Sequence, residues 1–383
     1  MLDGIHWQDA RASKTRRFTA EDSSVTTTTH MEFMADHDRV SLEAQLSRWG
    51  LKPAHAAPLL RAFYAASGRV DYAELDATRF GRGTLATLAA ALPLRQSKVR
   101  ARHASADGTV KLLIDFARGG AAEAVLMPAY RADRAAGCVS SQIGCAMGCD
   151  FCASTRHGLH RDLQSGEIVE QFLHLREVAA ASGRKLTSLV FMGMGEPLLN
   201  LPQVIAAIRR IAGADMGALG WRQITVSTVG VVPGIDALAE ADLNVHLAVS
   251  LHAPDDATRS RIVPVNRRWG VAAVMAAARR FEARTDRIPT IEYCMLEGVN
   301  DSEEQARLLG ELMAGFRAHV NLIPYNSIGT GLSGIVYRRP GEETVGRFLQ
   351  LLREAGVVAH VRRTRGDDVS AACGQLAGED YRR

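Results

Sequence analysis

The chain carries most of its cysteines in one short stretch, CVSSQIGCAMGCDFCASTRHGLHR, at residues 138–161. Cys145, Cys149 and Cys152 form a C-x3-C-x2-C pattern, and Cys138 precedes the first of them by seven residues. With six cysteines in 383 residues, such clustering favours metal binding or catalysis in a reducing compartment over a framework of disulfides. Because thiolates at these spacings can converge on one centre, the stretch predicts a metal site on a loop.

Two kinds of metal site fit these spacings. Structural zinc takes four ligands, usually as two separated pairs, so Cys138 or His157 would have to complete the set. Three closely spaced cysteines can instead hold three irons of a 4Fe-4S cluster and leave the fourth iron open to a substrate. The cysteines alone are compatible with both kinds, and the second would make this loop a reaction site.

From this loop to the C-terminus, short apolar strands alternate with amphipathic helices. Repeated strand–helix alternation predicts an α/β fold with a parallel sheet, and six such units predict a full or partial barrel. GMGEP (193–197) follows the first strand and Asn326 follows the fifth, at the edge where barrels carry their active sites. The predicted strands are LTSLVFM (186–192), QITVSTV (223–229), NVHLAVSL (244–251), TIEYCML (290–296), HVNLIPY (319–325) and VVAHVRR (357–363).

The residues before the cysteine loop fall into segments with different patterns. The N-terminal segment lacks apolar periodicity and is expected to be a mobile tail. The next has helical periodicity, with Ser41 expected as its first N-cap, and a third alternates apolar and polar residues around an Asp107-Gly108 turn. The expected boundaries are 1–40 for the tail, 41–95 for a helical accessory domain, 96–137 for an antiparallel β extension and 138–378 for the barrel with a catalytic C-terminal segment.

Composition restricts the class of protein. Although 47% of the residues are hydrophobic, no apolar run reaches the roughly 20 residues of a membrane-spanning helix. The N-terminus has no apolar signal core, so we expect a cytoplasmic protein without a membrane partner. The net charge is +4, and Arg, which binds phosphate in a bidentate manner, supplies most of the cations. A GC-rich genome would also raise the Arg content, so charge alone does not establish RNA binding.

Ordered motifs along the chain resemble a known superfamily. The C-x3-C-x2-C loop with GMGEP (193–197) after the next strand is typical of radical S-adenosylmethionine (SAM) enzymes. A longer set of motifs resembles the RlmN/Cfr family of RNA methyltransferases, and the likeness runs from about Ser41 to Gly378. The matching stretches are CVSSQIGCAMGCDFC, FMGMGEPLLN, TVSTVGVVP, SLHAPDD, IVPVN, IEYCML, GVNDS, NLIPYN and TRGDDVSAACGQLAG.

The resemblance implies a set of cofactors and the residues that bind them. A partial (β/α)6 radical SAM barrel would hold a 4Fe-4S cluster, whose open iron binds the amino and carboxylate groups of SAM. Two SAM molecules per turnover are implied, together with an electron donor such as flavodoxin. The implied cluster ligands are Cys145, Cys149 and Cys152, and the implied SAM contacts are Gly195, Glu196, Ser227, Ser250, Leu251, His252 and Asn326.

The resemblance also implies how an adenine ring carbon is methylated. Cys373 accepts a methyl group from one SAM, and a radical made from a second SAM removes hydrogen from it, so that the methylene adds to the base. Cys138 then attacks the Cys373 sulfur, which forms a transient disulfide and frees the methylated base. Glu123 is the implied proton acceptor. We expect the Arg run at 362–365 to contact the RNA, together with the helical domain and the β extension.

Substrate identity is the least specified part of this interpretation. SIGTGLSGIVYRRP (327–340) and STRHGL (154–159) depart from the family pattern near the expected entrance for substrate. The GMGEPL and TRGDD forms favour methylation of C2, as in RlmN, over C8, as in Cfr, on 23S rRNA, with tRNA left open. A non-methylating radical SAM enzyme and a zinc-bearing RNA-binding protein remain competing hypotheses. We expect a monomer, since the sequence contains no repeat or zipper.

Overall fold

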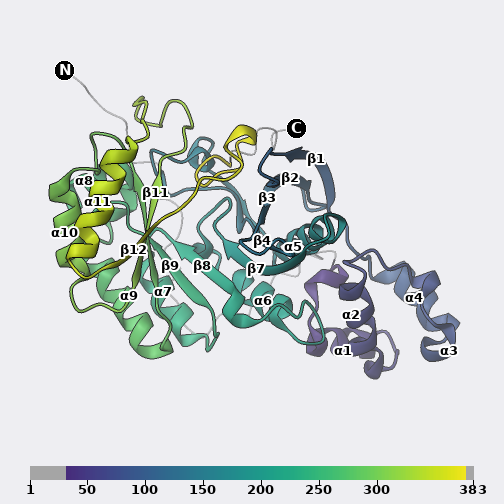
Figure 1. Cartoon of the computed structure of the whole chain (residues 1–383). Coiled ribbons are helices and arrows are strands. Elements are labelled where there is room, and N and C mark those ends of the chain that lie inside the picture. Colours follow the sequence, from purple (N-terminus) through teal and green to yellow (C-terminus); the bar gives the residue numbers. More distant parts are fainter. Residues whose placement is uncertain (1–31, 377–383) are drawn as a thin grey trace, which may run out of the picture. The chain divides into compact units, whose positions relative to one another are not determined.

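The computed structural model describes residues 32–376, and within that range one sheet has ten strands (Figure 1). Neighbours pair antiparallel from β1 to β4 and parallel from β4 to β12, so β4 belongs to both parts. In spatial order the strands are β1 (Lys98–Ala104), β2 (Val110–Asp115), β3 (Ala121–Pro128), β4 (Arg134–Cys138), β7 (Lys185–Phe191), β8 (Ile224–Thr228), β9 (His246–Ser250), β10 (Thr290–Met295), β11 (His319–Pro324) and β12 (Val358–Val361).

Amphipathic helices connect the parallel strands and pack against the outer face of the sheet (Figure 1). In α11, for example, Val345, Phe348 and Leu352 are buried while the opposite side is exposed, as the helical period requires. The helices of this part are α5 (Ser165–Ala181), α6 (Leu201–Ala212), α7 (Val232–Glu240), α8 (Asp256–Ile262), α9 (Val271–Thr285), α10 (Glu303–Met313) and α11 (Glu342–Glu354).

This arrangement confirms the predicted α/β fold with a parallel sheet, and each predicted parallel strand is found at its expected place. The sheet runs from an edge at β1 to an edge at β12 without closing, so the barrel is partial. The sequence prediction missed one parallel strand, β4, which pairs with β7. Its sequence, RAAGC, has small residues and no apolar run that would mark a buried strand.

A group of short helices precedes the sheet. Met34 and Ala35 are buried and pack against α5, so the folded region begins before the end of the expected tail at 1–40. The rest of that expected tail, residues 1–31, lies outside the described range, as does 377–378 of the expected barrel domain. The helices are α1 (Arg39–Arg48), α2 (Ala56–Ala65), α3 (Ala77–Phe80) and α4 (Arg82–Ala91).

The first of these helices begins differently from the prediction. Asp38 is the N-cap of α1, and its side chain accepts a hydrogen bond from the Ser41 N–H at 2.8 Å. The Ser41 hydroxyl in turn accepts from the Asp38 N–H at 3.0 Å, which completes a capping box. Ser41 therefore stabilises the helix from its third position and is not the N-cap itself.

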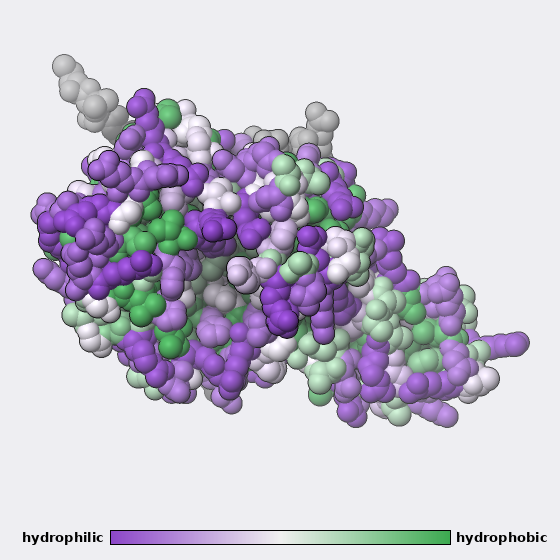
Figure 2. Space-filling model, in the orientation of Figure 1, coloured by the Kyte–Doolittle hydropathy of each residue, from purple (hydrophilic) through white to green (hydrophobic). Residues whose placement is uncertain are grey.

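The face of the molecule drawn in Figure 2 is mainly polar, since hydrophilic side chains predominate on it. Apolar side chains are instead gathered in one large core cluster, with a smaller one around Phe151, Ile262 and Tyr325 beside the cysteine loop. Among residues 32–376, no helix is both long enough and apolar enough to span a membrane.

Candidate active site

A two-stranded hairpin holds the ends of the cysteine loop together. Strand β5 (Gln142–Gly144) pairs antiparallel with β6 (Leu159–Asp162), and the Cys145 N–H donates to the Gly158 carbonyl at 3.0 Å. The loop between these strands carries Cys145, Cys149 and Cys152, and all three line one cavity, which we call the loop cavity. The hairpin thus turns a short run of sequence into one wall of a pocket.

The loop cavity is small, with a volume of about 140 Å³. The GMGEP turn forms part of its lining through Gly193, Gly195 and Glu196. Gly195 has φ +96°, and a Cβ there would lie 2.5 Å from the Gln142 Cβ, so this close approach of two backbones requires glycine.

The thiols of the three loop cysteines all have raised pKa values. Within residues 32–376, no three His, Cys, Asp or Glu side chains are placed to hold a single metal ion. Burial raises the pKa of Cys145 to about 12 and that of Cys149 well above its usual range, and the neighbouring thiols add to both effects. Burial also raises the pKa of Cys152. Three buried thiols of this kind fit a cationic iron–sulfur cluster, whose irons would stabilise the thiolates.

Glu196 is held rigidly at the edge of the loop cavity. Its carboxylate oxygens accept hydrogen bonds from the backbone N–H groups of Leu198 at 3.0 Å and Val229 at 2.9 Å. Burial raises its pKa to about 7, against the opposing effect of those hydrogen bonds. Since a carboxylate oxygen can accept more than one hydrogen bond, Glu196 retains acceptor capacity for an ammonium group.

Other predicted SAM contacts meet in the same cavity. Ser227 and Ser250, at the ends of β8 and β9, both line it, and the Ser227 hydroxyl donates to the Phe191 carbonyl at 2.5 Å. His252 also lines it, at φ +62°, while its Nδ1 accepts from the Cys294 N–H at 3.0 Å. Burial lowers the pKa of His252 to about 3, so the ring is neutral and positions β10 through Nδ1.

Leu251 and Asn326, the remaining predicted SAM contacts, do not line the loop cavity. The Leu251 side chain is fully buried in the core, and its N–H donates to the Glu292 carbonyl at 3.1 Å. Asn326 lines a second cavity, where its Nδ2 donates to the Cys373 carbonyl at 3.4 Å and its Oδ1 accepts from Thr364. In this structure Asn326 therefore orients the segment that carries Cys373.

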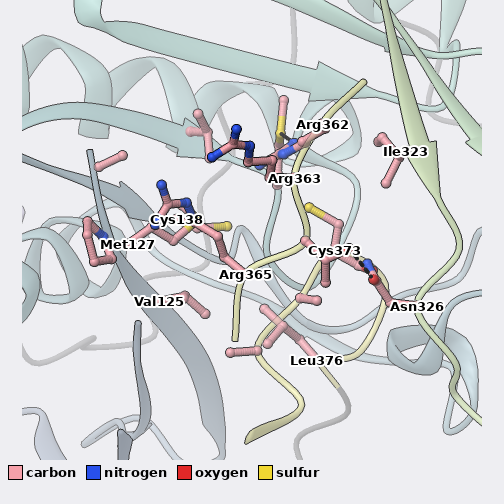
Figure 3. Close-up of a pocket in the computed structure, with 17 residues that line it drawn as sticks. Val125, Met127, Cys138, Ile323, Asn326, Arg362, Arg363, Arg365, Cys373 and Leu376 are labelled. Carbon is pink, nitrogen blue, oxygen red and sulfur yellow. Dashed lines mark hydrogen bonds between the residues drawn. The ribbon is translucent and has the colours of Figure 1, made fainter. Parts of the chain in front are cut away.

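The second cavity, which we call the Cys138 cavity, lies between β3, β4 and the C-terminal segment. Figure 3 shows Cys138 and Cys373 on facing walls of it with their sulfurs turned toward one another. Burial raises the pKa of Cys138 to about 12, the Cys373 thiol adds to that shift, and the Arg362 guanidinium opposes it. All six cysteines are free, so the structure contains no disulfide, and a Cys138–Cys373 bond stays a prediction for a transient state.

Cys373 belongs to both cavities. It lines the loop cavity together with the three motif cysteines, and it lines the Cys138 cavity as well, whereas Cys138 lines only the latter. Cys373 thus stands in the wall between a compartment with the predicted cluster ligands and a compartment with the second thiol. Met192, Ile323 and Arg362 share that wall.

Hydrogen bonds from several directions fix the C-terminal segment in place. The Gly366 N–H donates to Asp107 at the turn after β1, and the Ala153 N–H of the cysteine loop donates to the Gly374 carbonyl at 2.7 Å. Gln375 adds a bond from its side-chain amide to the Ser327 carbonyl at 3.1 Å. The β extension, the cysteine loop and the segment after β11 therefore jointly hold Cys373.

Glu123 is buried in the middle of the β extension, with 4% of its surface exposed. The Lys111 ammonium lies 3.0 Å from its carboxylate and also donates to the Ser370 carbonyl. Glu123 shares a face of β3 with Val125 and Met127, which line the Cys138 cavity, because alternate residues of a strand point the same way. It therefore lies beside that cavity without itself lining it.

The Arg run at 362–365 lies at the site and not on a solvated edge strand. Arg362 is partly buried and lines both cavities, while Arg363 and Arg365 line the Cys138 cavity alone (Figure 3). Negative charge on Cys373, Glu292 and Cys138 raises the pKa of Arg362, with Cys373 the largest cause. Arg362 thus places a positive charge near Cys373 and Cys138. This role was not predicted from the sequence.

Three further residues of the site were missed. Glu292 and Cys294 face the loop cavity from β10, and Asp150, between two cysteines of the loop, accepts hydrogen bonds from Ser333 and Tyr337. Cys294 also packs in the smaller core cluster around Phe151. The alternation along β10 was a signal that Glu292 and Cys294 share a face, but only strand pairing shows that this face lines the cavity.

Comparisons with known proteins agree with this geometry. Residues 139–309 match the family model of the radical SAM superfamily. A crystal structure of a radical SAM methyltransferase from Sphaerobacter thermophilus matches with a TM-score of 0.85 and 40% identity, covering 91% of this chain and 99% of that chain. The fold and the cysteine loop therefore define a radical SAM enzyme, which uses a 4Fe-4S cluster and SAM.

Curated relatives specify the family further. “Probable dual-specificity RNA methyltransferase RlmN 1” of Opitutus terrae is 54% identical over 339 residues, which is 88% of this chain and 94% of that protein. “Probable dual-specificity RNA methyltransferase RlmN” of Rhodopirellula baltica is 46% identical over 272 residues, 71% of each chain. The chain belongs to the RlmN family of radical SAM RNA methyltransferases.

Proposed function

We propose that this enzyme methylates carbon 2 of an adenine in 23S rRNA through an S-methylcysteine formed at Cys373. The observation that carries the proposal is the position of Cys373 in the wall between the loop cavity and the Cys138 cavity. A sulfur that receives a methyl group from SAM on one side and delivers it to a base on the other needs access to both. The dual specificity in the names of relatives favours a second RNA substrate, for which we propose tRNA.

The loop cavity would serve the radical chemistry. We assign the cluster to Cys145, Cys149 and Cys152; when bound there, it would supply the electron that converts SAM into a hydrogen-abstracting radical. The Cys373 thiolate first accepts a methyl group from one SAM, an ordinary nucleophilic step, and then gives up a hydrogen atom from that methyl group when a second SAM is used. Its methylene carbon then bonds to the adenine ring.

The Cys138 cavity would serve release of the product. The Cys138 thiolate attacks the Cys373 sulfur, the bond from that sulfur to the methylene carbon breaks with its electron pair on carbon, and a disulfide forms between the two cysteines. The released carbon takes up a proton to become the methyl group, and the one electron left over from the radical addition would return to the cluster. Arg362 favours the thiolate form of Cys138 by its charge. Glu123, beside this cavity, is the proposed acceptor of the adenine ring proton, and Lys111 holds its carboxylate. The RNA base must leave its stack to reach the cavity.

The remaining partners follow from the same proposal. The cluster needs a one-electron donor, for which a flavodoxin is the expected class, and the disulfide needs a thiol reductant after each turnover. We expect the enzyme to act as a monomer in the cytoplasm, where rRNA and tRNA are found. Arg363 and Arg365, which line the Cys138 cavity, are proposed contacts for RNA phosphates near the base.

The decisive experiment is anaerobic methylation of unmodified 23S rRNA fragments and of tRNA, followed by mass spectrometry of the nucleosides. We expect 2-methyladenosine with the reconstituted enzyme and none with Cys373→Ala. Cys294→Ala is the matched control, since Cys294 also lines the loop cavity but has no proposed chemistry, and it should retain product. Formation of 8-methyladenosine would overturn the choice of carbon, and product from Cys373→Ala would overturn the mechanism.

A further inference from the structure

Glu292 presents an unused carboxylate oxygen to the loop cavity. It lies in β10, is 4% exposed and lines that cavity. Its Oε1 accepts a hydrogen bond from Asn321 Nδ2 at 3.1 Å, whereas Oε2 has no hydrogen-bond partner among the residues that the structure describes. A buried carboxylate oxygen left unpaired is costly, so this atom is expected to have a partner in the loaded enzyme.

Strand pairing places other polar groups at the same level of the sheet. Glu292 pairs in register with Ser250 on β9 and with Asn321 on β11. Asn321 holds one carboxylate oxygen and thereby orients the other. The Arg362 guanidinium acts on Glu292 across the same cavity, although no ion pair between the two is found within residues 32–376. Burial raises the pKa of Glu292, and Arg362 and Asn321 oppose that shift.

The donor groups of SAM limit what this oxygen can bind. They are the ammonium group, the adenine amino group and the two ribose hydroxyls. The ammonium is expected at the cluster, near the cysteine loop and Glu196. The ribose carries the 5′ carbon, which must approach Cys373 if Cys373 donates the hydrogen atom, and Arg362 lies close enough to interact with both Cys373 and Glu292. A carboxylate that binds ribose hydroxyls is a recurrent solution in nucleotide sites.

We propose that Glu292 Oε2 accepts a hydrogen bond from a ribose hydroxyl of SAM, with Asn321 as the residue that positions the carboxylate. The choice of the ribose rests on the proposed role of Cys373, but the binding of SAM itself does not. Glu292 would thereby fix the sugar whose 5′ carbon must reach the methyl group carried by the Cys373 sulfur, and so set the direction in which that carbon points.

Equilibrium binding to the cluster-loaded protein tests this inference without using RNA. The probes are SAM, 2′-deoxy-SAM and 3′-deoxy-SAM, and the proteins are the wild type and Glu292→Gln. We expect the wild type to bind at least one deoxy analogue about tenfold or more weakly than SAM. Glu292→Gln should bind SAM weakly by a similar factor and should no longer distinguish that analogue from SAM. Asn321→Ala keeps the Glu292 carboxylate but removes the hydrogen bond to its Oε1. This variant should weaken SAM binding by an intermediate factor.

The controls separate a binding defect from a folding defect. Glu304→Gln, the same substitution on the exposed side of α10, should leave binding unchanged. Iron content and the unfolding midpoint show whether Glu292→Gln is intact, and discrimination by the wild type provides a test that needs no variant. The inference fails if the wild type binds all three ligands equally, or if Glu292→Gln still discriminates between them as the wild type does. Neither result bears on whether 2-methyladenosine is formed, so the proposed function would stand.

Discussion

A buried histidine makes a quantitative prediction about stability and pH. His174 of α5 is 4% exposed, and its Nε2 lies 2.9 Å from the Ser97 hydroxyl just before β1. Glu170, one turn earlier, accepts hydrogen bonds from the N–H groups of Gln96 at 2.9 Å and Ser97 at 2.8 Å. Burial lowers the pKa of His174 to about 3 from its ordinary value of 6.5, and the charge of Arg95 adds to this shift. These hydrogen bonds of His174 and Glu170 anchor the start of the β extension to α5.

The size of the effect follows from proton linkage. The unfolded chain binds a proton at His174 as the pH falls through about 6.5, whereas the folded protein does so only near pH 3, so stability falls over that window. At pH 5, about 1.5 units below the pKa of the unfolded chain, proton binding at His174 lowers the free energy of unfolding by about 2 kcal/mol, at 1.36 kcal/mol per unit. Burial raises the pKa of Glu170, which acts in the opposite direction, so a comparison of variants is needed.

Urea unfolding at pH 7.5 and at pH 5 measures the effect. The wild type should lose about 2 kcal/mol more between these pH values than His174→Gln, whose amide can keep a hydrogen bond to Ser97 without titrating. Ser97→Ala is the matched control, since it removes the hydroxyl partner but keeps the titrating ring, and it should retain the pH dependence of the wild type. Equal losses in the wild type and His174→Gln would refute the reasoning.

Two further predictions concern the cation at the thiols and the loop beside the cysteines. Arg362→Met should lower the yield of methyl-Cys373 after incubation with SAM by about tenfold or more, with partial recovery in Arg362→Lys, because the guanidinium charge favours thiolates. Intact-protein mass spectrometry measures this, and an unchanged yield would contradict the assigned role. Asp150→Asn should weaken the bonds from Ser333 N at 2.7 Å and from the Tyr337 hydroxyl at 2.5 Å by about 1–3 kcal/mol in total. Limited proteolysis should then cut residues 327–337 faster. An unchanged rate would contradict the reasoning that Asp150 holds this segment in place.

Periodicity predicted the fold wherever strands are rich in large apolar residues. Strand β10, observed at Thr290–Met295, was predicted as TIEYCML at 290–296, a short apolar stretch rich in β-forming residues. Strand β4 was missed because RAAGC buries little side-chain surface and is recognised only by its pairing with β3 and β7. The N-cap at Asp38 was missed because Ser41 is an equally good capping residue in sequence, and only backbone geometry distinguishes the two positions.

The site was predictable where spacing along the chain is itself the signal. Cys145, Cys149 and Cys152 lie on one short loop, so their common cavity needed no knowledge of distant contacts. Glu292 and Arg362 come from different strands, and whether they face a cavity depends on register and on which face of the sheet is interior. Asn326 was identified from its sequence motif as a SAM contact, but its side chain lines the Cys138 cavity and not the loop cavity.

The division into two cavities has a chemical consequence for the proposed reaction. Only Cys373 among the cysteines lines both cavities, so the sulfur can change partners while the backbone around it stays fixed by bonds to Asp107, Ala153 and Ser327. Cys138 lines only its own cavity, which would separate the proposed resolving thiol from the cavity in which we propose that SAM binds. Its position would thereby prevent a premature attack of Cys138 on SAM, and burial, which raises the pKa of Cys138, would keep this thiol protonated.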